Sequence, residues 1–447
     1  MQSKIEYKPH PYQEYCTQFI LNHKSCGLLL DMGLGKTIIT LSAIWDLCLD
    51  SFEVSRVLVV APLRVCKATW PTEITKFSNL EGLTYSVVVG SAKERRAALA
   101  KKAFIYIINR ENLVWLIEEG YFDFDLLVLD ELSSFKSYNT KRFKALKKVR
   151  SSVKRVIGLT GTPGDLMSLW PQIYLLDGGE RLEHFITAYR NKYFLPDKRN
   201  QTTIFSWKPK EGAEDIIYEK ISDICISMKS ADYLDMPKLV KNNVEVEMDK
   251  KETALYEQLK RDLIVPMVDG DIDAQSAVGL SLKLMQMASG MVYDENGIAR
   301  KIHDRKLDVV EDLIESAAGR PILIAYWFKF DKERLIERFG AVPIESSEDI
   351  DSWNRDEIPV GIIHPASASM GINLQLGSCR SLVYLTTPWS LELKAQCDAR
   401  LYRQGQKNTI TIYHLVSKNT IDEDILAALD RKDSTQEAIL AAVKARI

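Results

Sequence analysis

The stretch LLLDMGLGKTIITLSA, residues 28–43, decides how the first half of the chain is interpreted. A run of leucines ends, two glycines follow, and Lys36 and Thr37 open an amphipathic segment. The full phosphate-binding loop, G-x-x-x-x-G-K-[ST], requires a glycine where this chain has Leu30. The shorter form still supplies backbone N–H groups, a lysine for phosphate oxygens and a hydroxyl ligand for Mg²⁺, at a helix N-terminus that favours anions. We therefore predict a nucleotide-binding loop made of Gly33, Leu34, Gly35, Lys36 and Thr37.

A second signal is the apolar segment FDLLVLDELSSFKS, which ends in Asp130 and Glu131. A nucleotide site needs a carboxylate pair at the end of a neighbouring strand. Asp130 would hold Mg²⁺, and Glu131 would orient or deprotonate the attacking water. An acidic pair after one strand is a weak signal, because acidic residues often end strands by chance. Together with the glycine loop, the pair predicts nucleoside triphosphate hydrolysis.

Two further stretches can complete such a site. In GLTGTPGDLMSLW, residues 158–170, the Gly-Thr-Pro turn is either a strand stop or a relay in which Thr160 and Thr162 sense the γ-phosphate. Upstream, YKPHPYQEY places Gln13 before the first helix, where its amide could read the adenine edge. Gln13 alone would carry no meaning.

Composition limits the class of protein. The 447 residues exceed one ordinary core, so two domains of about 200 residues are expected. With 46% apolar and 27% charged residues, the chain is typical of a globular protein, and no stretch approaches the roughly 20 apolar residues that cross a bilayer. Seven scattered cysteines without a C-x-x-C pair, and six isolated histidines, argue against a structural metal and indicate a reducing compartment. We expect a cytoplasmic protein with no membrane partner and no secretion signal.

Short apolar runs alternate with helical patterns in two blocks. This alternation predicts an α/β fold of two tandem doubly wound parallel sheets, since continuously apolar strands are typical of sheets covered on both faces. Helices are expected at 331–338 and 391–402, and a mostly helical, more polar segment follows residue 166. We predict an N-terminal lobe, 1–235, with its helical segment at about 166–230, and a C-terminal lobe, 236–447. The crossing point is DMPKLVKNNVEVEMD, placed to within about 20 residues. The predicted strands are 56–62, 85–90, 104–108, 126–130, 155–161, 321–328, 361–366, 381–386 and 409–416.

The charge is unevenly distributed. The formal net charge is −2, yet FKSYNTKRFKALKKVRSSVKR, residues 135–155, carries nine lysines and arginines. Affinity for phosphate backbones must come from such a patch rather than from net charge. The alternative is a solvated helix face that packs through Phe143, Leu146 and Val149. Both interpretations remain open.

Near the C-terminus, Arg400 and Arg403 are three residues apart and would share one face of a helix. Two arginines that reach a γ-phosphate are arginine fingers, worth about 10³–10⁵ in the rate of phosphoryl transfer. The alternative is ordinary surface or ion-pair arginines, and Asp398 is close enough in sequence to pair with either.

Taken together, these motifs resemble the Swi/Snf-type DNA-dependent ATPases of helicase superfamily two. LDMGLGKT, at 30–37, matches the family motif D-E-M-G-L-G-K-T and accounts for the absent glycine. Asp130 and Glu131 match the D-E-x-H box, and LTGTP at 159–163 is identical to the third motif. The second block contains similar counterparts in ASMGINL, TPWS and QCDARLYRQGQ, at 368–374, 387–390 and 396–406.

The resemblance implies two RecA-like lobes with ATP bound in the cleft between them. It also implies that Thr160, Thr162, Gly371 and Gln396 couple the two lobes. Contacts to double-stranded DNA would come from Arg64, Arg110, Ser369, Asn373 and Trp389, which suit backbone contact rather than base readout.

Departures from the family pattern affect the prediction. Ser133 stands in place of a histidine and Ala399 in place of an aspartate, so hydrolysis and DNA binding could be coupled differently. The compact chain resembles forms from bacteria and their viruses, and we expect a monomer. The predicted function is an ATP-driven motor on duplex DNA, with a strand-separating DNA or RNA helicase, or a slow nucleotide-gated clamp or scaffold, as alternatives. Sequence identifies no protein partner.

Overall fold

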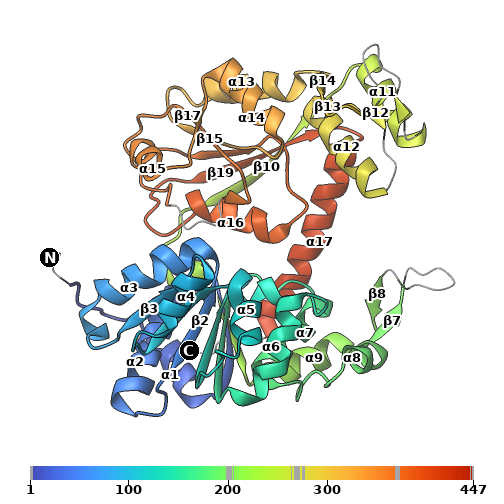
Figure 1. The fold of residues 1–447 in the computed structure, drawn as a ribbon. Helices are drawn as coiled ribbons and strands as arrows, with labels where there is room; N and C mark the ends of the chain where they lie inside the picture. Colours follow the sequence, from blue (N-terminus) through green and yellow to red (C-terminus); the bar gives the residue numbers. More distant parts are fainter. Residues whose placement is uncertain are drawn as a thin grey trace. The chain divides into compact units, whose positions relative to one another are not determined.

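The structure is a computed structural model that describes residues 4–197, 204, 206–262, 264–265, 272–273, 277–367, 373–442 and 444. The chain forms two compact units, Met1–Leu234 with Ser434–Ile447, and Asp235–Asp433. Each unit is an α/β structure built on a parallel sheet (Figure 1). The predicted fold class of two tandem parallel sheets is therefore confirmed.

The first unit contains a seven-stranded sheet in the order β3-β4-β2-β5-β6-β1-β9, with every neighbouring pair parallel. Most of its strands are buried along their whole length, because successive side chains enter two different cores. The strands are β1 (Ser25–Leu30), β2 (Val57–Ala61), β3 (Tyr85–Val88), β4 (Ile105–Asn109), β5 (Leu126–Asp130), β6 (Arg155–Thr160) and β9 (Cys225–Met228).

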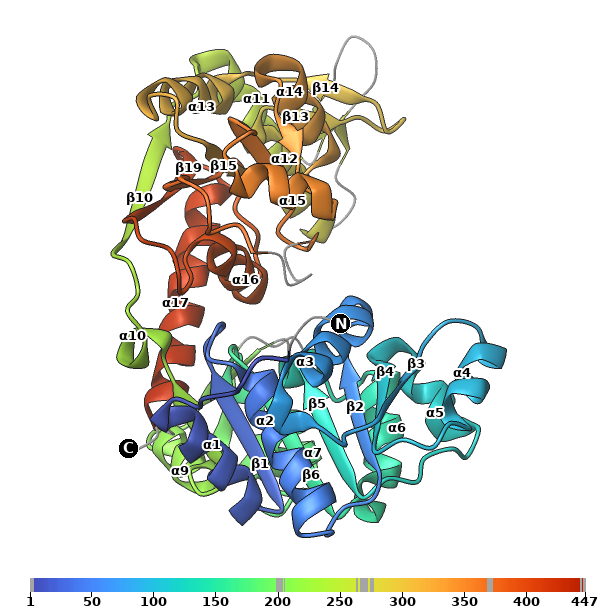
Figure 2. The same ribbon diagram turned by 90° about the vertical axis from the view of Figure 1, so that its left-hand side faces the viewer.

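Helices cover both faces of this sheet, as Figure 2 shows for α1 and α2 on one face and α6 and α7 on the other. Leu127 and Leu129 of β5 enter one core, whereas Leu126 and Val128 enter the other. The helices of one face are α1 (Pro11–Asn22), α2 (Lys36–Trp45) and α3 (Trp70–Lys76). Those of the other core are α4 (Ala92–Leu99), α5 (Leu113–Glu118), α6 (Lys141–Val149), α7 (Leu166–Asp177), α8 (Ile186–Tyr193) and α9 (Ala213–Ile221).

The second unit contains a six-stranded parallel sheet in the order β10-β19-β18-β15-β17-β16. Its strands are β10 (Leu239–Val246), β15 (Ile322–Ala325), β16 (Val342–Pro343), β17 (Val360–Ile363), β18 (Ser381–Tyr384) and β19 (Ile410–Ser417). One core involves α13 (Arg305–Ser316) and α14 (Lys329–Phe339), and another involves α15 (Ser347–Asn354) and α16 (Leu391–Leu401). A third core gathers α11 (Lys250–Asp262), α12 (Ala277–Ser289) and the start of α17 (Ile421–Ala442).

Smaller elements complete the chain. Two hairpins are β7 (Phe194–Pro196) with β8 (Trp207–Pro209), and β13 (Met291–Tyr293) with β14 (Ala299–Lys301). The short helix α10 (Ser230–Tyr233) lies between the two large sheets in sequence, and the antiparallel pair β11 (Ile264–Val265) and β12 (Ile272–Asp273) lies between β10 and β15 of the second sheet. Within the described residues, no helix combines the length and the apolar character that crossing a membrane requires.

The two units divide between Leu234 and Asp235, one residue from the predicted lobe boundary, but two other features differ from the sequence-based prediction. The predicted crossing point contains β10, an edge strand that pairs with β19 along eight residues. Moreover, Ser434–Ile447 cluster with the first unit rather than with the second. Ile439 and Leu440 are buried in the first unit's core, Ser227 donates a hydrogen bond to the carbonyl of Leu440, and Lys229 pairs with Glu437 at 2.9 Å. These contacts explain why the last turns of α17 belong to the first unit.

A buried ion pair connects α13 to the start of α17 in the second unit. Lys306 Nζ lies 2.7 Å from Asp422 Oδ2, and the two side chains are 0% and 5% exposed. The same ammonium donates to the carbonyl of Leu385 at 2.9 Å, and Asp422 accepts the backbone N–H of Ser417 at 3.0 Å. Each charge is therefore compensated inside the core.

We predict that Lys306→Met lowers the free energy of unfolding of the second unit by about 3–5 kcal/mol, because it leaves Asp422 buried without its cation. Urea denaturation of the whole chain, followed by circular dichroism, measures the loss. Lys329→Met is the control, since its pair with Glu333 is 82% and 63% exposed; it should cost less than about 0.5 kcal/mol. An equal loss in the two variants would contradict a structural role for the buried pair.

Candidate active site

The glycine loop lies at the carboxyl edge of the first sheet, between β1 and α2. Gly33 and Gly35 have φ angles of 90° and 78°, in the left-handed region that glycine adopts without strain. A Cβ atom on Gly35 would also lie 2.6 Å from Gln13 Nε2. The sequence therefore needs glycine at position 35 for both backbone conformation and space.

Lys36, the first residue of α2, reaches back over the loop. Its Nζ donates to the carbonyls of Leu30 at 2.7 Å and Asp31 at 3.1 Å. Gly161 faces the same region, because a Cβ there would lie 3.1 Å from the Leu30 carbonyl and 3.9 Å from Lys36 Nζ. Thr37 follows, half-buried, in the first turn of α2. The loop and the turn after β6 are thus in direct contact.

Gln13 is buried against this loop. Its Oε1 accepts the backbone N–H of His10 at 2.9 Å and the hydroxyl of Tyr7 at 3.2 Å, while its Nε2 contacts the Leu34 carbonyl at 3.4 Å. The structure therefore connects Gln13 to the glycine loop, and its predicted contact with adenine stays a prediction.

Asp130 ends β5, and its carboxylate is held by an indole. Trp70 Nε1–H donates to Asp130 Oδ2 at 2.8 Å, and the Trp70 side chain is fully buried at the start of α3. Burial raises the pKa of Asp130, whereas the Trp70 hydrogen bond and the nearby charge of Lys36 lower it. Sequence reasoning missed Trp70; its one signal was a tryptophan within the polar run KATWPTE.

Glu131 has a left-handed backbone, with φ 64°, and its carboxylate accepts two hydroxyl groups. Ser133 Oγ donates to Glu131 Oε1 at 2.8 Å, and Thr160 Oγ1 donates to the same oxygen at 3.1 Å. Thr160 Oγ1 in turn accepts the backbone N–H of Thr162 at 3.1 Å. The two predicted relay threonines are therefore connected to the predicted catalytic carboxylate, and Ser133 contacts that carboxylate directly.

The donor set at this edge fits a magnesium nucleotide. Mg²⁺ prefers oxygen ligands, usually one or two carboxylates completed by phosphates and water. Asp130 supplies a carboxylate, Thr37 a hydroxyl group, and the N-terminus of α2 with Lys36 supplies donors for phosphate oxygens. The strand register places Asp130 close to the loop, because Asp130 of β5 and Leu28 of β1 are both paired with Leu159 of β6.

Two predicted DNA-contacting arginines in the first unit lie at the same edge. Arg64 follows β2, and Arg110 follows β4, where its Nε contacts Glu111 Oε1 at 3.2 Å. Because β4 pairs in parallel with β2, and β2, β5, β6 and β1 pair in parallel in turn, both arginines leave the sheet on the side of the glycine loop.

The basic segment 135–155 is partly structural. Phe143 and Leu146 of α6 are buried, which confirms the predicted helix packing. Arg150 donates to the carbonyls of Leu175 and Leu176. Lys141, Lys144 and Lys148 remain exposed on α6, so contact with a phosphate backbone stays a prediction.

In the second unit the two predicted arginine fingers have different local structures. Arg400 is buried on α16, and its Nε donates to the Gln396 carbonyl at 3.1 Å. The expectation that both arginines share one helix face is wrong, because α16 ends at Leu401 and Arg403 lies in the following turn. Arg403 donates to the Asn373 side chain, and burial lowers its pKa.

Asp398 is close enough in sequence to pair with either of these arginines. Instead it pairs with Lys394 at 2.7 Å and accepts the Tyr384 hydroxyl at 2.7 Å. Gln396 is buried on α16, and Trp389 is 37% exposed, with its indole N–H directed at Met285 Sδ. Ser369 and Gly371 lie outside the described residues.

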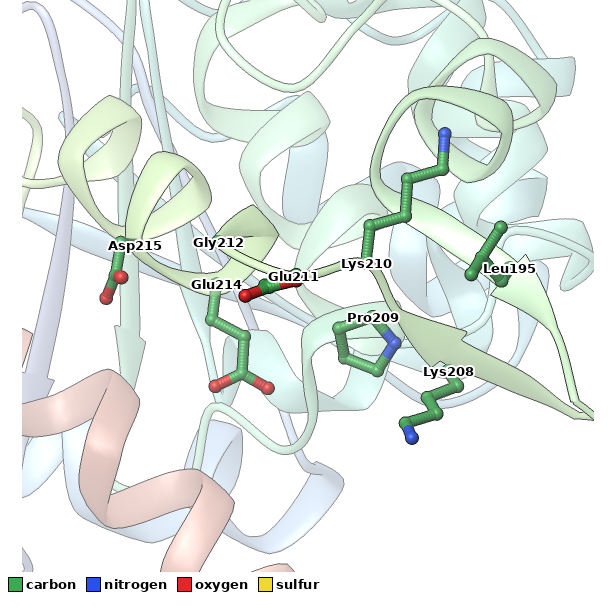
Figure 3. Close-up of a pocket in the computed structure, with 8 residues that line it drawn as sticks. All are labelled: Leu195, Lys208, Pro209, Lys210, Glu211, Gly212, Glu214 and Asp215. Carbon is green, nitrogen blue, oxygen red and sulfur yellow. The ribbon is translucent and has the colours of Figure 1, made fainter.

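A separate hollow of about 480 Å³ lies beside β8 and the start of α9 (Figure 3). Lysines and carboxylates both line it, and it shares no residue with the glycine loop. It therefore does not correspond to the predicted nucleotide site. Its lining residues are Leu195, Lys208, Pro209, Lys210, Glu211, Gly212, Glu214 and Asp215.

The chain is similar to known proteins along most of its length. A family model described as the SNF2-related domain matches residues 12–291. Protein p41 of Acyrthosiphon pisum secondary endosymbiont phage 1 is 34% identical over 98% of this chain and 99% of its own length. An uncharacterized ATP-dependent helicase of Mycoplasma genitalium is 22% identical over 91% of this chain, and a DNA repair and recombination protein RAD54-like of Danio rerio is 22% identical over 94%.

The chain spans only 39% of the length of the mycoplasma helicase and 64% of that of the RAD54-like protein. Among solved structures, the Sulfolobus solfataricus SWI2/SNF2 ATPase core in complex with dsDNA has a TM-score of 0.48 at 22% identity, covering 99% of this chain and 95% of that one. Since the family model matches more than half of the chain, and the phage relative is similar along almost its whole length, this protein belongs to the SNF2-related family, as an ATPase of helicase superfamily two.

Proposed function

We propose that this ATPase is a motor that hydrolyses ATP, with Mg²⁺, to step along double-stranded DNA. The observation that carries the proposal is the convergence of Lys36, Asp130 and the Glu131–Thr160 pair at one edge of the first sheet. We further propose a monomer in the cytoplasm of a bacterial or phage-infected cell, in keeping with the phage relative.

The residues of the first unit then have distinct roles. The N–H groups at the start of α2 and the Lys36 ammonium bind phosphate oxygens. Thr37 and Asp130 would hold Mg²⁺, which neutralises phosphate charge when bound. Glu131 accepts the proton of the attacking water or orients that water, and Ser133 and Thr160 hold its carboxylate in place. Gln13 is assigned to the adenine edge.

We assign Arg400 and Arg403 the role of arginine fingers, which the family resemblance implies. A buried guanidinium has lost hydration and so gains from an anionic partner, and burial is what lowers the pKa of Arg403. Gln396 and Gly371 are assigned to the coupling of the two lobes. These roles remain proposals for the second unit.

For DNA, the arginines at the carboxyl edge, Arg64 and Arg110, suit contacts with the phosphate backbone. The RAD54-like relative is named as a DNA repair and recombination protein, which supports DNA as the partner. Ser369, Asn373 and Trp389 are the corresponding assignments in the second unit. A strand-separating helicase and a slow nucleotide-gated clamp remain the alternatives, and the two experiments below distinguish them.

We predict that Lys36→Ala lowers ATP turnover by on the order of 10²–10³, because a charged donor to the phosphates is lost. Glu131→Gln should lower turnover by a similar factor while nucleotide affinity stays near wild type, because the carboxylate acts on water rather than on nucleotide. Phosphate release and binding of a fluorescent nucleotide measure the two effects. Lys93→Ala, at an exposed lysine of α4 in the same unit, is the control. Unchanged turnover in Lys36→Ala would refute the site.

We also predict that duplex DNA stimulates ATP turnover more than single-stranded DNA, forked DNA or RNA does. Stimulation should weaken as salt rises, because backbone contacts displace counterions. A triplex-displacement assay and an unwinding assay, carried out together, then show whether the protein translocates, separates strands or does neither. Displacement without unwinding supports translocation on duplex DNA, unwinding supports a helicase, and turnover too slow for either supports a clamp.

A further inference from the structure

A short segment connects a proposed DNA contact to the proposed magnesium ligand. Arg64 follows β2, and Trp70 begins α3 only a few residues later. Between them, Val65–Thr69 form one turn of π-helix, an irregular geometry that is frequent at functional sites. The indole at the far end of the segment donates to Asp130 Oδ2 at 2.8 Å.

The acceptor of this hydrogen bond is unusual for a core tryptophan. Most buried indole N–H groups donate to an acceptor, and a backbone carbonyl suffices, as the Glu183 carbonyl does for Trp170 at 2.9 Å. Trp70 instead contacts a carboxylate at the end of β5. Because hydrogen bonds to charged groups are the stronger ones, this contact fixes the orientation of the carboxylate. Burial of the Trp70 ring in the core does not by itself require the Asp130 carboxylate as the acceptor.

We propose that Trp70 is a positioning residue that couples the Arg64 segment to Asp130, so that duplex DNA bound at this segment orients the magnesium carboxylate. The proposal rests on the proposed function above and adds a route by which DNA stimulates hydrolysis. Trp70 touches neither nucleotide nor water in this scheme and acts only through Asp130. The segment is short and packed at both ends, since Trp70 is fully buried and the Cys66 thiol donates to the Ala61 carbonyl at 3.4 Å.

Trp70→Phe is the test, because it removes the N–H and keeps most of the apolar ring. Two matched controls exist in the same unit. Trp170→Phe loses a hydrogen bond to a backbone carbonyl away from the site. Trp115→Phe removes an indole N–H that has no hydrogen-bond partner within the described part of the chain. The first control reports the loss of a structural hydrogen bond, and the second reports the loss of ring size.

The measurements are the affinity for a fluorescent ADP with and without Mg²⁺, the stimulation of ATP turnover by saturating duplex, and the affinity for duplex DNA. For Trp70→Phe we expect the Mg²⁺-dependent gain in ADP affinity, and the stimulation by DNA, each to fall by about tenfold, as expected for losing a hydrogen bond to a charged group. ADP affinity without Mg²⁺ and DNA affinity should change less than about twofold, because the phosphate loop and the DNA contacts are intact.

Two results would overturn the proposal. One is a Trp70→Phe protein whose Mg²⁺-dependent gain and DNA stimulation match those of Trp115→Phe. The other is a general loss of ADP affinity, with or without Mg²⁺, accompanied by the same drop in stability as Trp170→Phe, which would make Trp70 purely structural.

A second, independent experiment uses no variant of Trp70. In the wild type, saturating duplex should increase the Mg²⁺-dependent gain in ADP affinity, and in Arg64→Ala it should not; an equal increase in both proteins rejects the coupling. A wild type that duplex DNA fails to stimulate would refute the proposed function and the coupling with it. In that case the Mg²⁺-dependent gain in ADP affinity of Trp70→Phe still decides whether Trp70 positions Asp130.

Discussion

The parallel register of β5, β6 and β1 is the constraint from which the geometry of the site follows. Asp130 is paired with Leu159, and Leu29 is paired with Thr160. Glu131, the next residue after β5, therefore lies beside Thr160, and Gly33 of the glycine loop follows three residues after Leu30, the last paired residue of β1. A slip of one residue would turn Asp130 to the opposite face of the sheet and separate these groups. The cores on both faces prevent that slip, because they select which side chains of β5 point to each face.

Much of this fold could be predicted, because its strands are covered on both faces and so read as continuous apolar runs. The observed β2, β3, β4, β5 and β6 lie within or overlap the predicted ranges. The strand β10 was not predicted, and its residues were assigned to the crossing point, because LVKNNVEV is an edge strand with only one fully buried side chain and no apolar run identifies it. The last turns of α17 were assigned to the wrong unit, since their partners Ser227 and Lys229 lie some 200 residues earlier in the chain.

The residues of the candidate site also fall into two groups: those that a local sequence motif identifies, and those that depend on contacts between distant parts of the chain. Lys36 with its glycine loop, and Asp130 with Glu131, are local motifs, so the spacing of residue types identified them. Trp70 could not be found, because its contact with Asp130 depends on how α3 packs against β5. The sequence left the partner of Asp398 open. Lys394 lies one helical turn away on the same face of α16, a better placed partner than either arginine.

The turn after β6 gives the relay proposed for Thr160 and Thr162 a physical basis. A left-handed residue other than glycine costs of order 1–3 kcal/mol, so Glu131 keeps φ 64° only because its surroundings hold it. Thr160 is one of those restraints, and its hydroxyl also accepts the N–H of Thr162. Gly161, between the two threonines, packs on the Leu30 carbonyl close to Lys36 Nζ. Residues 160–162 thus lie against both the lysine assigned to the phosphates and the carboxylate assigned to water, which is the contact that a relay between these two groups requires.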